Sequence, residues 1–352
     1  MIYPNWRDDH IWRLTDDTGM IQHAKYGVPD PASGYTTDDN ARALILAVSL
    51  YEQTGRRKYL NLAYRYLSFV LNAQNTRGKF RNFMAYNREF LEQEGSEDCF
   101  GRCLWALGYT LASPHTPANM KHVCREIIKK ALPAVQELQF ARGKAYSLIG
   151  LGYLESAGAK ELTNRLTRSL LSQYRKHNSP DWHWFEDTLT YSNAILPWAL
   201  FTAYQSLQEA EILTVALESL AFLENICFQP GYFKPVGCKG WFSRGGRPAP
   251  FDEQPLEAGE MTLAYLAAYR ATGRQDFLVK ACRCLAWYHG ENSSGLSLID
   301  RETAGCYDGI TESGLNLNQG AESIISYGIA RLAMQKAQQE KHTPAIRPHS
   351  TG

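Results

Sequence analysis

The sequence predicts an all-α protein, an (α/α)6 toroid in which six helical hairpins form a closed ring. First, apolar residues recur at positions i, i+3, i+4 and i+7 in segments of roughly 15 to 20 residues, the pattern of amphipathic helices. Second, these segments come in pairs. Third, the first member of each pair is apolar on nearly all sides, whereas the second carries a charged stripe. We therefore expect an inner and an outer ring of helices, because a charged stripe must face water.

The pairs follow one another along the chain as Thr37–Thr54 with Lys58–Gln74, Glu97–Leu111 with Asn119–Leu138, Lys144–Ala157 with Lys160–His177, Leu189–Leu207 with Glu211–Cys227, and Pro255–Thr272 with Asp276–His289. A sixth inner helix, Gly320–Lys336, has no partner after it, and Asn5–Thr15 at the other end of the chain can supply one. The turns inside pairs are short, as in TGRRK and SAGAK, which is typical of αα-hairpins. The links between pairs are longer, and we expect β-hairpins in two of them, Gly78–Phe90 and Gly231–Phe242.

An open solenoid of helical hairpins is the alternative all-α arrangement. Solenoid repeats have more regular lengths than these segments, so the closed ring is favoured. We predict a single toroid domain over residues 1–336. Residues 337–352, which end in KHTPAIRPHSTG, are expected to form a disordered tail.

The composition argues against some classes of function. Of the 352 residues, 37 are Lys or Arg and 36 are Asp or Glu, and the basic residues are dispersed, which argues against binding to nucleic acid. No apolar stretch reaches the roughly 20 residues that a membrane span needs, and Met1–Asp9 lacks the apolar region of a signal peptide. The eight cysteines form no CxxC pair and are expected to be buried free thiols. We therefore expect a cytoplasmic protein with no nucleic-acid or membrane partner.

Distinctive polar motifs lie at the starts of the predicted inner helices. They are GYTTDDNAR (34–42), GSEDCFGR (95–102), WHWFEDTLTYSN (182–193), FDEQPLEAGE (251–260) and NLNQGAES (316–323). In a toroid all inner helices start on the same face, so these distant segments converge there and predict a functional site. Acids and hydroxyls at helix starts are also ordinary N-caps. Capping alone leaves unexplained why aromatic residues crowd beside the acids in two of the motifs.

Paired carboxylates are what the cleavage of a glycosidic bond requires. One carboxylic acid protonates the leaving oxygen while a second carboxylate activates water or attacks the sugar directly. The acid needs a raised pKa, which aromatic neighbours and a second carboxylate provide. The candidates for these catalytic roles are Asp39, Glu186, Asp187 and Glu257.

Other polar or aromatic residues near these acids and in the long loops are candidates for binding the substrate. They are Tyr35, Asp38, His23, Trp182, His183, Trp184, Glu253, Arg244, Asn318 and Glu322. Trp and Tyr can stack on the apolar faces of sugar rings, or they can fill a core. Arg244, in SRGGRP, can bind a substrate carboxylate or phosphate, or it can belong to a solvated turn. The histidines can be sugar ligands or structural residues.

The sequence predicts neither a metal site nor a cofactor. It contains no HExxH, no Cys/His cluster and no EF-hand spacing. It also contains no GxGxxG, no Walker A sequence and no GxSxG elbow. The expected partner is a carbohydrate substrate alone.

Taken together, the motifs resemble those of the six-hairpin glycosidase superfamily over about residues 5–336. The helix start GYTTDDNARAL looks like the Asp-Asp helix start of bacterial endo-α-1,6-mannanases, and the layout is similar to that of unsaturated glucuronyl hydrolases and N-acylglucosamine 2-epimerases. The combined set DDTG…QHA, GYTTDDNAR, EDxxGRxLWALG, FEDxLTYxNAxLP and QPLEAGEM looks like a subgroup of sugar-active toroids often encoded with glycosyltransferases.

For the mannanase-type enzymes the resemblance implies an adjacent aspartate pair that acts as catalytic acid and nucleophile. Here Asp38 and Asp39 form such a pair in the first inner helix, where they can instead bind substrate. The epimerases rely on paired histidines at late inner helices. The last predicted inner helix of this chain carries Glu322 and no histidine, which argues against epimerisation.

We therefore expect a glycoside hydrolase-like enzyme that cleaves a short glycan with paired carboxylates. A sugar epimerase or isomerase of the same fold is the first alternative, and it would need His23 or His183 as proton carrier. A non-catalytic carbohydrate-binding protein is the second. A glycoside phosphorylase is a variant of the leading hypothesis, in which Arg244 would bind phosphate.

Overall fold

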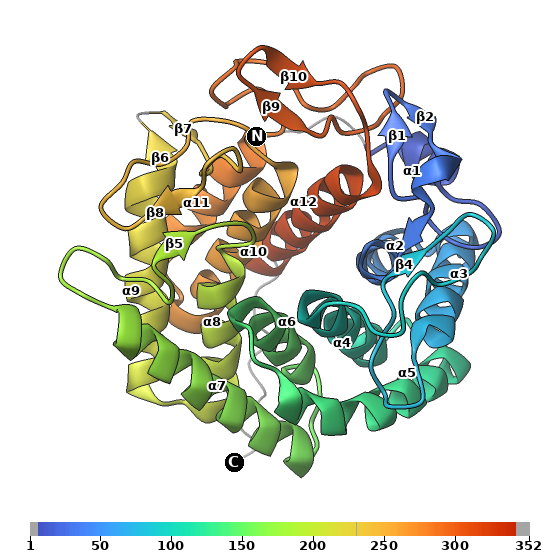
Figure 1. Ribbon diagram of the computed structural model, residues 1–352, viewed down its shortest axis with the longest axis horizontal. Helices are drawn as coiled ribbons and strands as arrows, with labels where there is room; N and C mark the ends of the chain where they lie inside the picture. The colour runs from blue at the N-terminus through green and yellow to red at the C-terminus, as the bar shows by residue number, and fades with distance from the viewer. Residues whose placement is uncertain (1–5, 230, 343–352) are drawn as a thin grey trace, which may run out of the picture.

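The computed structural model describes residues 6–229 and 231–342, and it shows two concentric rings of helices (Figure 1). The inner helices are α2 (Thr37–Thr54), α4 (Glu97–Ala112), α6 (Ala141–Leu151), α8 (Ile195–Leu207), α10 (Pro255–Thr272) and α12 (Ala321–His342). The outer helices are α1 (Asp9–Leu14), α3 (Arg57–Ala73), α5 (Ala118–Ala131), α7 (Ala157–His177), α9 (Ala210–Cys227) and α11 (Gln275–Ala286). Two 3-10 turns, η1 (Pro31–Ser33) and η2 (Leu132–Glu137), complete the helical elements.

The inner ring is closed. Each inner helix packs against the next in chain order, and α12 packs back onto α2. An open solenoid would leave its first and last repeats apart, so the contact between α12 and α2 confirms the predicted (α/α)6 toroid. The inner helices are buried on almost every side, as their apolar sequences predicted.

Several predicted boundaries differ from the structure. The third inner helix ends at Leu151 rather than Ala157, because the chain turns after Gly152. The fourth begins at Ile195 rather than Leu189, because residues 188–189 form a strand and 190–194 a turn. The expected N-terminal helix is the short α1, and Asn5 lies outside the described residues. The last helix continues to His342, beyond the expected start of the tail, whose residues 343–352 also lie outside the described part of the chain.

Short strands join the loops that precede the inner helices. They are β1 (Ala24–Lys25), β2 (Val28–Pro29), β3 (Tyr35–Thr36), β4 (Phe83–Met84), β5 (Thr188–Leu189), β6 (Phe228–Gln229), β7 (Tyr232–Phe233), β8 (Phe242–Ser243), β9 (Gly309–Thr311) and β10 (Gly314–Asn316). The strands form five antiparallel pairs: β1 with β2, β3 with β4, β5 with β8, β6 with β7, and β9 with β10.

Of the two β-hairpins expected within single loops, the first is present and the second is wrong. In 78–90 the chain does fold back on itself: a bridge joins Met84 to Phe90, and the backbone N–H of Ala85 donates to the carbonyl of Glu89. Strand β4 also pairs with β3 from the preceding loop. In 231–242, strand β7 pairs with β6, which precedes it in the chain. Phe242 belongs to β8, which pairs with β5 from another loop. Loops from neighbouring hairpins of the toroid lie side by side, so they complete one another's backbone hydrogen bonds. Periodicity within one loop does not reveal such partners.

The two inner helices α4 and α6 approach each other so closely that their contact needs glycine. A Cβ atom on Gly101 would lie 2.6 Å from Cβ of Tyr146, and one on Gly150 would lie 2.5 Å from the carbonyl carbon of Leu104. Such distances are shorter than carbon atoms tolerate, so the absence of a side chain sets the spacing of the two helices at this point.

Replacing Gly150 by alanine is expected to lower the free energy of unfolding by about 1–3 kcal/mol, the usual effect of overpacking a core. Chemical denaturation of the purified protein measures it. Gly158, in the outer helix α7, is the matched control because a Cβ there meets nothing within 4 Å. Gly158→Ala should leave stability unchanged or raise it by about 1 kcal/mol. Equal losses in the two variants would show that the α4–α6 spacing is not fixed by backbone contact.

Candidate functional site

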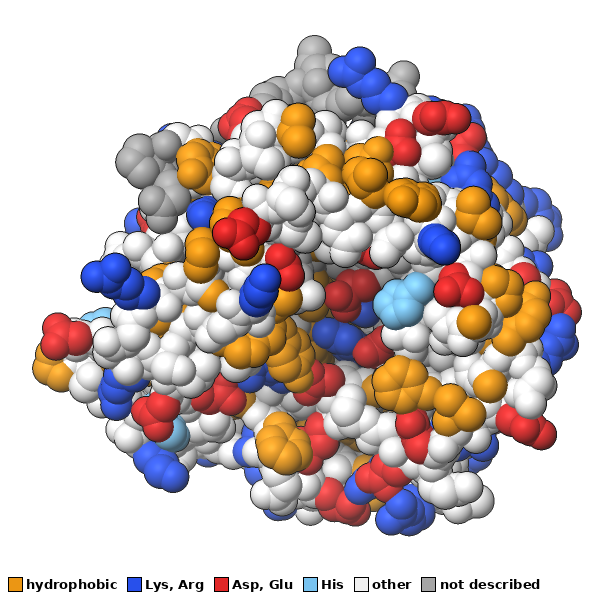
Figure 2. Space-filling model, turned by 45° about the horizontal axis from the view of Figure 1, so that its top comes forward, with side chains coloured by type: hydrophobic (Ala, Val, Ile, Leu, Met, Phe, Trp, Pro, Cys, Tyr) orange, Lys and Arg blue, Asp and Glu red, His pale blue; other side chains and the backbone are white. Residues whose placement is uncertain are grey.

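The inner helices all start on one face of the ring, and that face is hollowed, with acidic and basic side chains at the bottom of the hollow (Figure 2). A cavity of about 290 Å³ lies there, and we call it the mouth cavity. Its charged lining includes Asp38, Asp39, Arg42, Glu322 and Asp308. These residues come from α2, from α12 and from the loop before α12, and Gln254 and Pro255 at the start of α10 also line the cavity. Three of the five predicted motifs therefore meet here, whereas 95–102 and 182–193 contribute no lining residue.

The first turn of α2 places two carboxylates at this cavity without using either of them as the N-cap. Thr36 is the cap: its Oγ1 accepts a hydrogen bond from the backbone N–H of Asp39 and donates one to Asp39 Oδ2 at 2.6 Å. Because a hydroxyl caps the helix, capping does not account for Asp38 and Asp39. The positive end of the helix dipole favours the negative charge that they carry there.

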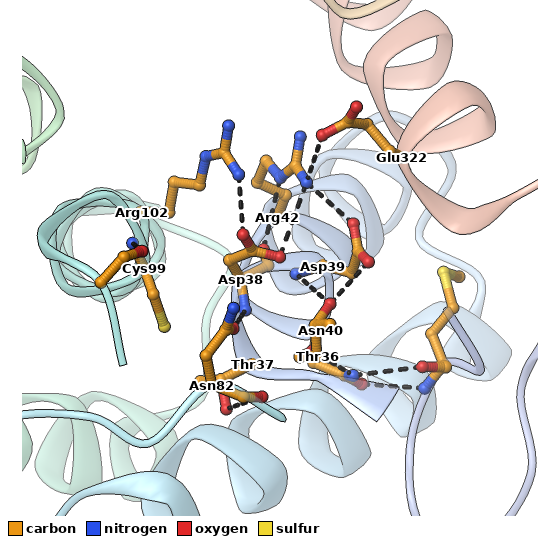
Figure 3. A network of polar contacts seen from close by, with 12 residues as sticks. Thr36, Thr37, Asp38, Asp39, Asn40, Arg42, Asn82, Cys99, Arg102 and Glu322 are labelled. Atoms are coloured by element: carbon orange, nitrogen blue, oxygen red, sulfur yellow. Dashed lines mark hydrogen bonds and ion pairs between the residues drawn. The ribbon is translucent and has the colours of Figure 1, made fainter. Parts of the chain in front are cut away.

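Arg42 is the centre of the charge network around the cavity (Figure 3). Its Nη2 lies 2.8 Å from Asp39 Oδ1, 3.0 Å from Glu322 Oε2 and 3.8 Å from Asp38 Oδ1. A second arginine, Arg102 of α4, donates from Nη1 to Asp38 Oδ2 at 2.7 Å. Both guanidinium groups are almost fully buried, so they act on the carboxylates with little screening by water.

The pKa values of the two adjacent aspartates are shifted in opposite directions. Burial, together with the charge of Asp38, raises the pKa of Asp39 to about 7. Burial acts on Asp38 too, but the charges of Arg102 and Arg42 outweigh it and lower the pKa of that carboxyl. Neighbouring carboxyl groups separated in this way can hold one proton between them near neutral pH, the arrangement that general acid catalysis requires.

A second acidic pair lies on α10, behind the mouth cavity. Glu257 accepts hydrogen bonds from the backbone N–H groups of Ser192 and Asn193, and burial raises its pKa to about 7. Glu260 accepts from the hydroxyl of Tyr146, and burial together with the charge of Glu257 raises its pKa to about 8. Glu257 is therefore held by backbone, and Glu260 is the more strongly perturbed of the two.

This pair predicts a pH dependence of stability. In the unfolded chain both carboxyls titrate near 4.5, whereas in the folded protein the pKa values are about 7 and about 8. Between these values the folded state holds protons that the unfolded state has lost, so the free energy of unfolding falls as pH rises from about 5 to 8. Each group contributes a slope of up to about 1.4 kcal/mol per pH unit. Glu260→Gln should make the slope shallower, as measured by denaturation at several pH values.

The control for that prediction is Glu126→Gln, on the exposed surface of outer helix α5. It should keep the slope of the parent protein, because no buried carboxyl is removed. A Glu260→Gln protein whose stability has the same pH dependence as the parent would contradict the raised pKa of Glu260.

The remaining acidic candidates, Glu186 and Asp187, lie apart from the mouth cavity. Glu186 is 30% exposed and forms an ion pair with Arg142 Nη1 at 2.8 Å. Asp187 is 65% exposed, and Arg244 Nη1 lies 3.5 Å from its Oδ1. Neither residue lines the cavity that contains Asp38 and Asp39. Arg244, a predicted substrate ligand, also donates from Nη2 to the backbone carbonyl of His177 and to Ser179 Oγ.

Several predicted substrate ligands are occupied in packing. Trp182 and Trp184 are at most 3% exposed and pack with Phe222, so their faces are not open to a sugar. Tyr35 is buried and donates its hydroxyl hydrogen bond to Asp16. Glu253 is fully buried and accepts from Trp287 Nε1 at 2.8 Å.

The other predicted ligands divide between the cavity and the surface. His23 is exposed at the mouth cavity, where Glu322 also lies. His183 contacts Asn178 through Nδ1 at 2.9 Å, and Asn318 accepts from the backbone N–H of Tyr26. Both of these lie outside the lining of the mouth cavity.

The basic and phenolic residues that bind these acids were not predicted from the sequence. Arg42, Arg102, Arg142 and Tyr146 lie within the first two turns of inner helices and bind the acids directly. A signal was present, because an arginine inside a helix that is otherwise apolar must have a buried partner. Phe83 was also missed: it lines the mouth cavity and is 44% exposed, so it offers an aromatic face there.

Other features of the described chain bear on function more weakly. None of the eight cysteines forms a disulfide; Cys238 and Cys282 are half-buried and the others are buried, largely as predicted. Among the described residues, no three His, Cys, Asp or Glu side chains are grouped as a metal site would need. None of the helices in this part of the chain is both long and apolar enough to cross a lipid bilayer.

No family model and no curated protein matches the sequence. Solved structures match at low identity. The cellobiose 2-epimerase from Bacillus thermoamylovorans is 12% identical, with a TM-score of 0.74 over 94% of this chain and 95% of that one. A GH76 alpha-mannanase from Bacteroides thetaiotaomicron is 11% identical, with a TM-score of 0.64 over 95% of each chain. A D-mannose isomerase is 10% identical, with a TM-score of 0.67 over 95% of this chain and 96% of that one. The chain therefore shares the (α/α)6 toroid fold of these solved structures, the fold that its sequence predicted.

Proposed function

We propose that this protein is a glycoside hydrolase whose general acid is Asp39. The observation that carries the proposal is the arrangement of acids at the mouth cavity, in which Arg42 contacts both Asp39 and Glu322 while Arg102 binds Asp38. Burial and the charge of Asp38 raise the pKa of Asp39, whereas the two arginines lower the pKa of Asp38. Titratable neighbours that are driven apart in this way mark acid and base roles. The cavity volume of about 290 Å³ leaves room for about one sugar ring beside them.

In the proposed reaction Asp39 donates its proton to the glycosidic oxygen as the bond to the anomeric carbon breaks. Glu322, from α12, takes a proton from a water molecule, and the hydroxide attacks the anomeric carbon. The proton on Glu322 then returns to Asp39 through solvent, so the net change is the addition of one water. Arg42 holds both carboxylates, with Nη2 2.8 Å from Asp39 and 3.0 Å from Glu322, and so fixes their relative positions.

The other predicted acids receive supporting roles in this proposal. Glu257 orders the backbone at residues 192–193, and Glu186 orients Arg142. A solved alpha-1,6-mannanase supports the use of an adjacent pair, since its inactive variant, with two consecutive aspartates changed to alanine, is in complex with alpha-1,6-mannotetrose. That protein is 13% identical to this one, so its substrate comes here only as a first choice for testing.

The test is digestion of alpha-1,6-mannotetrose and a wider panel of oligosaccharides by the purified protein, with and without phosphate, followed by chromatography of the products. Release of shorter sugars without phosphate is expected. Asp181→Asn is the matched control for Asp39→Asn and should retain full activity, because Asp181 is exposed and lies outside the mouth cavity. Binding of sugars without any cleavage would identify a non-catalytic carbohydrate-binding protein instead. Cleavage only with phosphate would identify a phosphorylase.

An epimerase or isomerase is the second candidate, favoured by His23, an exposed histidine at the mouth cavity. An imidazole there can take the proton from C2 of a reducing sugar, with Asp39 as its partner acid. The measurement is proton NMR of cellobiose or mannose incubated with the protein in D2O. Epimerisation would be supported if the wild-type protein removes the C2 proton signal and the His23→Gln protein does not. A C2 signal that stays unchanged over days with the wild-type protein would exclude epimerisation.

A further inference from the structure

A second cavity lies at the opposite end of the ring from the mouth cavity. It has a volume of about 350 Å³, and all six inner helices contribute to its lining through their middle and C-terminal parts. We call it the rear cavity. It shares no lining residue with the mouth cavity among the described parts of the chain. The two cavities therefore occupy opposite ends of the same axis.

The wall of the rear cavity is aromatic. Trp105 and Trp198 meet edge to face with ring centroids 5.2 Å apart, and Tyr109 and Tyr153 do the same at 5.7 Å. Packing of this kind holds four large rings in fixed orientations. The rings line a cavity of the size that small ligands occupy, which is roughly 300–1,000 Å³.

Polar side chains at the same cavity have both signs of charge. Glu52 accepts a hydrogen bond from the hydroxyl of Tyr109 at 3.0 Å, and Lys336 Nζ lies 3.8 Å from Glu52. Arg270 and Glu340 also line the cavity, so two carboxylates face two cations and the formal charge is zero. A neutral ligand is favoured, because an ion of either sign would meet as much repulsion as attraction.

We propose that the rear cavity is a second binding site, for a neutral mono- or disaccharide. Sugars combine apolar ring faces with a rim of hydroxyls. The half-buried Tyr109 and Tyr153 offer ring faces for stacking, whereas Trp105 and Trp198 are buried and back the wall behind them. The hydroxyls need donors and acceptors around the rings, and Glu52, Gln205 and Arg270 supply them. The site is independent of the proposed hydrolysis, because none of its residues belongs to the mouth cavity.

The test is a fluorescence titration with D-mannose and with cellobiose, since Trp105 and Trp198 in the cavity wall should report on a bound sugar. It uses the full-length Asp39→Asn protein, so that catalysis does not consume the sugar. Ala333→Phe fills the cavity from α12 and is expected to raise Kd at least tenfold. Arg270→Ala removes an exposed polar group and is expected to raise Kd a few-fold.

Ala118→Phe is the matched control, because Ala118 is exposed at the start of outer helix α5, and it should leave Kd unchanged. A titration that Ala333→Phe and Arg270→Ala leave unchanged would overturn the proposal, as would the absence of any signal with both sugars. The result is separate from the proposed function. Failure of the wild-type protein to cleave glycans leaves this titration interpretable, and failure of the titration leaves the digestion assay interpretable.

Discussion

Replacement of Asp39 by asparagine is expected to lower kcat by about 10²- to 10⁴-fold, the usual effect of removing a general acid. Asparagine has the same shape and can still contact Thr36 and Arg42, but it cannot give a proton to the leaving oxygen. KM should change little, because binding of the sugar does not depend on the proton. Initial rates at several substrate concentrations separate the two constants.

The pH profile of the wild-type enzyme provides an independent test of the same role. Asp39 must be protonated to act, and its pKa is about 7, so activity should decline as pH rises through about 7. Asp181→Asn should keep this profile. An Asp39→Asn protein that retains both the rate and the alkaline decline would show that the proton donor is another residue.

Replacement of Arg42 by methionine is expected to lower the free energy of unfolding by about 3–5 kcal/mol, the range for breaking a buried ion pair by removing one partner. Its guanidinium lies within 4 Å of three carboxylates, those of Asp38, Asp39 and Glu322. Without it, Asp38 keeps Arg102 as its counter-charge, whereas Asp39 and Glu322 lose the cation that both contact. Denaturant unfolding measures the loss.

Arg168→Met is the matched control, since Arg168 forms an exposed ion pair with Glu209 on the outer surface. Such pairs contribute about 0–1 kcal/mol. Adding Asp39→Asn to Arg42→Met should recover part of the lost stability, because it removes one of the unpaired charges. Equal effects of Arg42→Met and Arg168→Met would contradict the role of Arg42 as the centre of the network.

The sequence predicted the fold well and the site only in outline. Helix periodicity is a local property of the sequence, and an inner helix such as 255–272 can be predicted because it is apolar on nearly all sides. The positions of Asp38, Asp39 and Glu322 at one cavity followed from topology, because inner helices start on one face. The roles of the aromatic residues did not follow. Trp184 beside Glu186 has the same sequence pattern whether it packs inward or faces a sugar, and only the contact with Phe222 decides between them.

Long-range partners explain the remaining differences. Asp187 looks like half of a catalytic pair in the sequence, yet the loop pairing of β5 with β8 brings Arg244 to it and leaves it exposed. Glu253 stands in an acidic run, yet the buried indole of Trp287, which is 34 residues away, accounts for it. Neither contact has a signature in spacing along the chain, because each depends on how separate loops fold over one another.

The capping of α2 by Thr36 has an evolutionary consequence. Ser96 is likewise the N-cap of α4, where its Oγ accepts a hydrogen bond from the backbone N–H of Cys99. Since hydroxyls cap these helices, a change of the acids next to them would leave the caps in place. Asp38 and Asp39 are paired with the buried Arg102 and Arg42, so we expect the charges around the mouth cavity to be exchanged as matched pairs while the scaffold persists. Because different residues cap the helices and carry the charges, one ring of helices can support different chemistry.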